Sequence, residues 1–128
     1  MTLILDTHTF LWFVTDDPLL SADVPSLIAD PANDILISPA SDWEIAIKVS
    51  IGKYPLTVPF DRFFTEGIEG NDFEILPVGI RHAAVLASPP MHHRDPFDRM
   101  IVAQAIHEGI AVVSADRAFD SYPVTRLR

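Results

Sequence analysis

Short apolar runs that alternate with segments of helical periodicity limit the folds open to this chain. The runs span three to six residues, and most are followed by a stretch whose apolar residues recur at helical spacing. Strands are predicted at Leu3–Leu5, Asp34–Ser38, Phe73–Leu76, Ile110–Val113 and Tyr122–Leu127. Helices are predicted at Thr7–Val14, Ser21–Ala29, Ser41–Ser50, Phe60–Gly67, Arg81–Ala87 and Pro96–His107. This order predicts an α/β fold in three layers, with a mostly parallel central sheet flanked by helices.

Composition bounds the class of protein. The chain has 128 residues, which predicts one domain over 1–128. With 48% hydrophobic and 21% charged residues a disordered chain is excluded, and the lack of cysteine excludes disulfides and thiolate metal sites. Neither a signal peptide nor an apolar run of the ~20 residues that span a bilayer is evident, so we expect a soluble cytoplasmic protein with no membrane partner.

The net charge of −9 argues against a protein that coats nucleic acid, because such proteins bind phosphates with lysine and arginine. It does not exclude an enzyme whose acids hold divalent cations. Ligands of parallel sheets bind at the carboxyl ends of the strands. Asp6 and Asp116 follow two predicted strands, while Glu44 and Asp98 lie near the starts of two predicted helices.

The surroundings of two of these acids favour a metal site. Asp98 shares a helix face with Ile101 and Val102, and Asp6 ends a buried strand next to Phe10. A carboxylate in such a place is costly unless it is paired or bound to a cation. Oxygen ligands of this kind suit Mg²⁺ and Mn²⁺.

Each acid also has a local, structural interpretation, and these alternatives stay open. Asp6 and Asp116 can cap the segments that follow them. The string from Ser41 to Glu44 fits a capping box, and Glu44 can instead pair with Lys48 one turn later. Asp95, followed by proline, is a strong helix start that places Asp98 in the first turn.

The acids lie within longer strings that together resemble the PIN-domain ribonucleases, in particular the toxin subunits of VapBC-type toxin–antitoxin pairs. The strings are LDTHTFLW at 5–12, SDWEIAIK at 41–48, HRDPFDR at 93–99 and SADRAF at 114–119. The resemblance covers essentially the whole chain. It implies a Mg²⁺- or Mn²⁺-dependent endoribonuclease in which a metal-activated water cleaves RNA. Asp6, Asp98 and Asp116 would be the more direct ligands, and Glu44 would complete the site or orient water.

Two positions depart from the family pattern. Asp95 adds a fifth acid, for which capping is the better interpretation, although a shift of the ligand role from Asp98 to Asp95 stays open. Ser114 stands where many relatives carry threonine, and either hydroxyl can hydrogen-bond near the metal.

Substrate and partner contacts are further expectations. Four cations near the acids are candidates for phosphate binding: His93, Arg94, Arg99 and Arg117. An ion pair with Asp95 is an equally good interpretation for Arg99. A metal role for the histidines at 8, 82, 92 and 93 is weakly supported, because oxygen-ligand metals do not favour imidazole.

The resemblance implies a hydrophobic groove that receives a helix of a VapB-like antitoxin, with Leu11, Trp12, Ile47 and Ile51 as candidate residues. The acidic net charge suits a basic antitoxin tail, and a symmetric homodimer is expected. Trp12 and Trp43 are predicted to be core residues rather than base-stacking platforms, and the Phe60–Phe64 stripe is also predicted to be core.

Other functions remain to be weighed. A PIN-like nuclease acting on DNA is open, because no residue that reads the RNA 2′-OH is identifiable. A non-catalytic α/β module is a different class. A receiver domain is disfavoured because Thr7 and His8, not a second acid, follow Asp6, and a degenerate partner-binding domain would have lost an acid, whereas all four are present.

Overall fold

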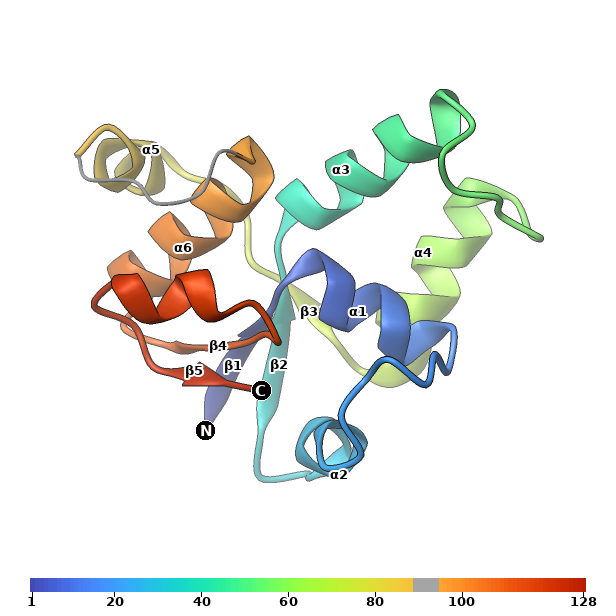
Figure 1. The fold of residues 1–128 in the computed structure, drawn as a ribbon, viewed down its shortest axis with the longest axis horizontal. Coiled ribbons are helices and arrows are strands. Elements are labelled where there is room, and N and C mark those ends of the chain that lie inside the picture. Colours follow the sequence, from blue (N-terminus) through green and yellow to red (C-terminus); the bar gives the residue numbers. More distant parts are fainter. Residues whose placement is uncertain (89–94) are drawn as a thin grey trace.

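The computed structural model describes residues 1–88 and 95–128. It has a central sheet whose strands follow the order β3-β2-β1-β4-β5, and each described pairing is parallel (Figure 1). The strands are β1 (Thr2–Leu5), β2 (Asp34–Ile37), β3 (Glu74–Ile75), β4 (Ala111–Val113) and β5 (Arg126–Leu127). The predicted parallel α/β sheet is confirmed.

Helices cover both faces of the sheet, with α5 and α6 on one side and α1, α2 and α4 on the other (Figure 1). The α-helices are α1 (Thr7–Val14), α2 (Val24–Ala29), α3 (Pro39–Ser50), α4 (Phe60–Ile68), α5 (Ile80–Leu86) and α6 (Pro96–Glu108). Two 3-10 helices, η1 (Glu69–Asn71) and η2 (Arg117–Ser121), complete the described elements. No described helix has the length and apolar character needed to cross a membrane.

Alternating residues of β1 separate two hydrophobic cores. Leu3 and Leu5 pack with Phe10 of α1 on one face, and Ile4 packs with Ile101 of α6 on the other; all five are fully buried. This alternation follows from the pleat, which sends successive side chains to opposite faces. The predicted three-layer arrangement is therefore confirmed, as is the placement of the Phe60–Phe64 stripe against the first core.

Helix α3 begins earlier than predicted. Ser38 is its N-cap and accepts a hydrogen bond from the Ala40 amide at 3.0 Å, while Pro39 occupies the first turn. Ser41 consequently lies inside the helix, where its Oγ accepts a hydrogen bond from the Thr7 hydroxyl at 3.0 Å. The predicted capping box from Ser41 to Glu44 is wrong, because Ser38 and Pro39 provide an earlier start of the kind that helices favour.

Several other elements are shorter than predicted, among them β3, which spans Glu74–Ile75 instead of Phe73–Leu76. Helix α2 begins at Val24, next to a proline in its first turn, rather than at Ser21. The last predicted strand, Tyr122–Leu127, is reduced to Arg126–Leu127. By contrast, α6 begins after the predicted cap Asp95 and ends at Glu108, followed by the C-cap Gly109 in a left-handed conformation with φ of 66°.

Candidate active site

Asp6 is held at the end of two adjacent strands. Because Leu5 of β1 is in register with Val113 of β4, the residues that follow them, Asp6 and Ser114, lie side by side. The Ser114 hydroxyl donates to Asp6 Oδ2 at 2.5 Å, and the Thr9 amide donates to Asp6 Oδ1 at 2.9 Å. Parallel pairing thus joins residues that are 108 positions apart in the sequence.

The burial of Asp6 makes its negative charge costly. The side chain is 4% exposed, and desolvation raises its pKa, although the hydrogen bonds from Ser114 and Thr9 act in the opposite direction. The two donors therefore orient the ionised carboxylate, but their hydrogen bonds offset only part of the cost of burying its charge. A nearby cation would favour it.

Glu44 is buried with one oxygen bound and one oxygen without a partner. Its Oε2 forms an ion pair with Lys48 Nζ at 2.8 Å, so the predicted pairing one turn apart is confirmed. Its Oε1 has no hydrogen-bond partner among the residues that the structure describes. A buried acceptor without a partner costs free energy, and a metal ion would remove that cost.

Asp98 lies in the first turn of α6, half-buried, and is surrounded by like charges. Its pKa is raised to about 7, first by desolvation and then by the charges of Asp95, Asp6, Glu44 and Asp116, in that order of strength. These acids come from four separate segments of the chain, so the fold does bring the predicted acidic residues around Asp98.

Asp95 and Asp116 keep the local roles that the sequence also predicts. Asp95 Oδ1 accepts hydrogen bonds from the Phe97 and Asp98 amides, at 2.7 and 3.3 Å. The exposed Asp116 caps η2 by accepting from the Ala118 amide at 2.9 Å. In the described segments, no three of the acids around Asp98 have oxygens within 4.8 Å of one another. A bound cation would have to draw these oxygens inward.

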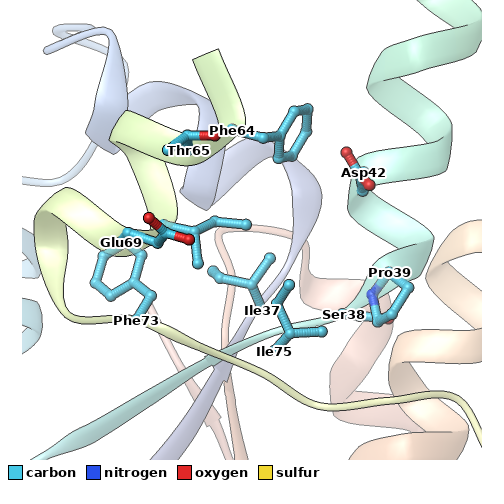
Figure 2. Close-up of a pocket in the computed structure, with 10 residues that line it drawn as sticks. Ile37, Ser38, Pro39, Asp42, Phe64, Thr65, Glu69, Phe73 and Ile75 are labelled. Carbon is cyan, nitrogen blue, oxygen red and sulfur yellow. The ribbon is translucent and has the colours of Figure 1, made fainter. Parts of the chain in front are cut away.

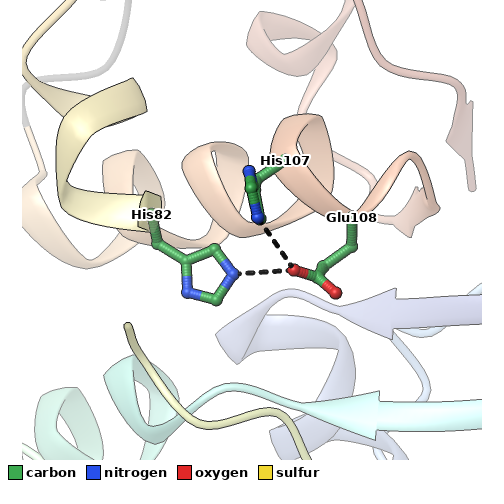
Figure 3. Close-up of side chains that lie close together, drawn as sticks. All are labelled: His82, His107 and Glu108. Atoms are coloured by element: carbon green, nitrogen blue, oxygen red, sulfur yellow. Dashed lines mark hydrogen bonds and ion pairs between the residues drawn. The ribbon is translucent and has the colours of Figure 1, made fainter. Parts of the chain in front are cut away.

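The described residues do contain one compact group of potential ligand atoms, at the junction of α5 and α6 (Figure 3). His82 Nε2 lies 3.0 Å from Glu108 Oε2, and His107 Nε2 lies 3.8 Å from the same oxygen. The Gly79 amide donates to His82 Nδ1 at 2.9 Å, so the proton of a neutral ring is on Nε2 and points to Glu108. His82 then has no lone pair for a metal, and the group ties the start of α5 to the end of α6.

The structure describes two of the four predicted phosphate-binding residues. Arg117 is exposed in η2, one residue after Asp116, and Arg99 is half-buried in α6, one residue after Asp98. His93 and Arg94 lie outside the described residues, and so does His92.

The prediction that Trp43 is a core residue is wrong. Its side chain is 65% exposed, and its ring contacts that of Phe97 edge-on at a centroid distance of 5.4 Å. The buried residues of α3 are Ala40, Ser41, Glu44 and Ile45, which places Trp43 on the outer face. A signal was present in the sequence, since Trp43, Ile47 and Ile51 are spaced four residues apart and form a separate stripe. Trp12 is half-buried and stacks on His8, rather than lying in the core.

The candidate groove residues lie on two neighbouring helices. Ile47 of α3 and its C-cap Ile51 are 38% and 59% exposed, while Leu11 and Trp12 are half-buried on α1, which contacts α3. Contiguous exposed apolar side chains are typical of protein–protein contacts.

A pocket that the sequence did not predict lies between α3 and α4, above the ends of β2 and β3 (Figure 2). Its volume is about 530 Å³, and its walls are mainly apolar, with the carboxylates of Asp42 and Glu69 among the lining residues. Asp42 projects from α3 toward Phe64 of α4. Burial raises the pKa of Asp42, and its Oδ1 has no hydrogen-bond partner in the described part of the chain.

Comparison with known proteins gives consistent results. Residues 3–124 match the PIN domain family. Ribonuclease VapC22 of Mycobacterium tuberculosis is 28% identical over 131 residues, which cover 97% of both chains.

Solved structures share the fold at low identity. A chain of the VapBC2 crystal structure from Rickettsia felis, bound to a promoter DNA fragment, superposes with a TM-score of 0.67 at 17% identity, covering 100% of this chain and 98% of its own. DNA-bound VapBC from Salmonella typhimurium gives 0.65 at 18%, covering 100% and 97%. FitAcB from Neisseria gonorrhoeae gives 0.62 at 17%, covering 98% and 96%. Because the family match extends over nearly the whole sequence and the fold agrees with it, this chain belongs to the PIN domain family.

Proposed function

We propose that this protein is a Mg²⁺- or Mn²⁺-dependent endoribonuclease and the toxin of a VapBC-type toxin–antitoxin pair. The observation that carries the proposal is the convergence of carboxylates around Asp98, whose pKa is raised to about 7 by burial and by like charges from three other segments of the chain and from its own helix cap. The curated relative is named a ribonuclease, which supports the same activity.

The donor set fits a hard divalent cation. The groups around Asp98 are carboxylates, and Mg²⁺ and Mn²⁺ prefer oxygen ligands. Glu44 Oε1 is buried with no hydrogen-bond partner among residues 1–88 and 95–128, and Asp6 is buried with a raised pKa. Asp6, Asp98 and Asp116 would hold the ion, and Glu44 would complete the site. Asp95 is the poorer candidate, since two amides of α6 already donate to its Oδ1.

The bound cation would supply a water of lowered pKa and would neutralise the charge that develops on the phosphoryl oxygens. The protein positions the acids for this purpose. Ser114 and Thr9 orient the two oxygens of Asp6, and Lys48 orients Glu44. Arg99 and Arg117, together with His93 and Arg94, are proposed to contact the substrate phosphates.

Asp116→Asn is the sharpest test of the activity. An asparagine retains the side-chain oxygen that accepts from the Ala118 amide, so the cap of η2 survives while the charge is lost. The purified protein, freed of any antitoxin, should cleave RNA with Mg²⁺ or Mn²⁺ and stop on addition of EDTA. The variant should be inactive with an unchanged melting temperature, and Asp34→Asn, an exposed site at the opposite edge of the sheet, should remain active. Equal cleavage by Asp116→Asn would contradict the assignment, and preferential cleavage of DNA would establish the alternative substrate.

The proposed partner is a VapB-like antitoxin with a basic, partly apolar segment. Ile47 of α3 and its C-cap Ile51 are exposed, and Leu11 and Trp12 of the neighbouring helix α1 are half-buried. The pocket between α3 and α4 adds apolar walls with carboxylates, and the chain as a whole carries a net charge of −9. Such a surface suits an amphipathic helix with basic flanks. The homodimer is proposed from the family resemblance, and the cytoplasmic location from the sequence pattern.

A further inference from the structure

A contact between an exposed tryptophan and a half-buried phenylalanine joins the helices that carry Glu44 and Asp98. Trp43 directly precedes Glu44 in α3, and Phe97 directly precedes Asp98 in α6. The two rings meet edge-on, with centroids 5.4 Å apart and planes at 78°. The pair therefore links the two helices that present two of the proposed metal ligands.

Packing does not account for the position of Trp43. Phe97 is half-buried and packs against the second core, so it is anchored, whereas the indole of Trp43 is 65% exposed. Contact with an anchored ring restricts the rotamers of the indole and leaves much of its surface open to solvent. A restricted aromatic ring binds a flat partner at low entropic cost.

Charge also limits how this protein can hold RNA. The chain has 18 acidic and 9 basic residues, and Lys48, the cation on α3 nearest in sequence to Glu44, is paired with that residue. Phosphate contacts by lysine and arginine are therefore a weak source of affinity. Stacking of a base on an aromatic ring does not depend on basic residues and tolerates any sequence.

On these grounds we infer that Trp43, supported by Phe97, stacks on an unpaired nucleobase next to the phosphodiester that is cleaved. The inference rests on the proposed nuclease function and requires that the stacked base be unpaired, because a base inside a duplex has no free face. Trp43 is thus a substrate-binding residue, distinct from the acids that hold the cation.

Cleavage kinetics test the inference. Loss of one base–aromatic stack in Trp43→Ala should raise KM for a single-stranded RNA by about 5- to 150-fold and leave kcat within about twofold. Trp43→Phe should restore most of the affinity, since phenylalanine keeps an aromatic face. Leu19→Ala, at a side chain with 69% exposure in the α1–α2 connection, is the matched control and should leave KM unchanged. Melting temperatures show whether each variant is folded.

A binding measurement separates this inference from the proposed activity. In a Trp12→Phe background Trp43 is the remaining tryptophan, because the chain has two. Single-stranded RNA is added with Mg²⁺ to the double variant Trp12→Phe, Asp116→Asn. It should quench the fluorescence of Trp43, and a duplex of the same sequence should not. Quenching without cleavage by the native chain would refute the nuclease proposal but support the stacking role. Cleavage of RNA by Trp43→Ala with an unchanged KM would overturn the stacking role. So would a Trp43→Ala variant that loses antitoxin binding but keeps its RNA affinity.

Discussion

Replacing Asp98 by asparagine is predicted to stabilise the metal-free protein while abolishing its activity. In the folded state burial and the neighbouring acids raise the pKa of Asp98 from 3.8 to about 7. Between these values the folded chain keeps a proton that the unfolded chain has released. The free energy of unfolding of the native chain should therefore fall as the pH rises from about 4 to about 7 and stay low above it.

The magnitude follows from the size of the shift. A displacement from 3.8 to about 7 corresponds to roughly 4 kcal/mol for a fully buried carboxyl group. Asp98 is half-buried, so solvent screening reduces the repulsion to about 1–2 kcal/mol. Asparagine has nearly the same shape without the charge. At pH 8, Asp98→Asn should accordingly melt roughly 4–10 °C above the native chain.

Thermal unfolding in EDTA, followed by circular dichroism from pH 4 to pH 8, measures this effect. The gain of Asp98→Asn should be largest at pH 8 and should disappear near pH 4, where the native Asp98 is protonated as well. Asp34→Asn, an exposed carboxylate at the far end of β2, should show no comparable gain. Added Mg²⁺ should raise the melting temperature of the native chain more than that of Asp98→Asn. A variant that is no more stable than the native chain at pH 8, or a gain that is independent of pH, would refute the convergence of charge on Asp98.

Three further outcomes are expected. Ser114→Ala removes the hydroxyl that donates to Asp6 and should lower the free energy of unfolding, measured by chemical denaturation, by about 1.5–3 kcal/mol. RNA cleavage should fall by more than the loss of folded protein accounts for. His82→Phe should lower the melting temperature because the link to Glu108 is lost, and Zn²⁺ should not stabilise the native chain; a clear Zn²⁺-induced rise would show that the cluster binds metal. Ile51→Glu should weaken antitoxin binding at least tenfold in a titration yet leave RNA cleavage intact, and unchanged binding would remove α3 from the proposed groove.

Much of the fold was predictable because its signals are local. Apolar runs such as Leu3–Leu5 differ in length and period from the helices that follow them, and Asp95 and Gly109 mark the ends of α6 within a few residues of the backbone groups they satisfy. Where two local signals competed, the boundary was missed, as at Ser38 and Ser41.

The sequence alone determined the parallel α/β order and the identity of the acids, because strand period, helix caps and motif strings involve neighbours along the chain. Tertiary structure decided that Asp98 titrates near neutrality and that Trp43 faces solvent. Both properties depend on atoms from distant segments: the charges of Asp6, Glu44 and Asp116 reach Asp98 only through the sheet and helix packing, and exposure of an indole is set by what the rest of the chain leaves uncovered.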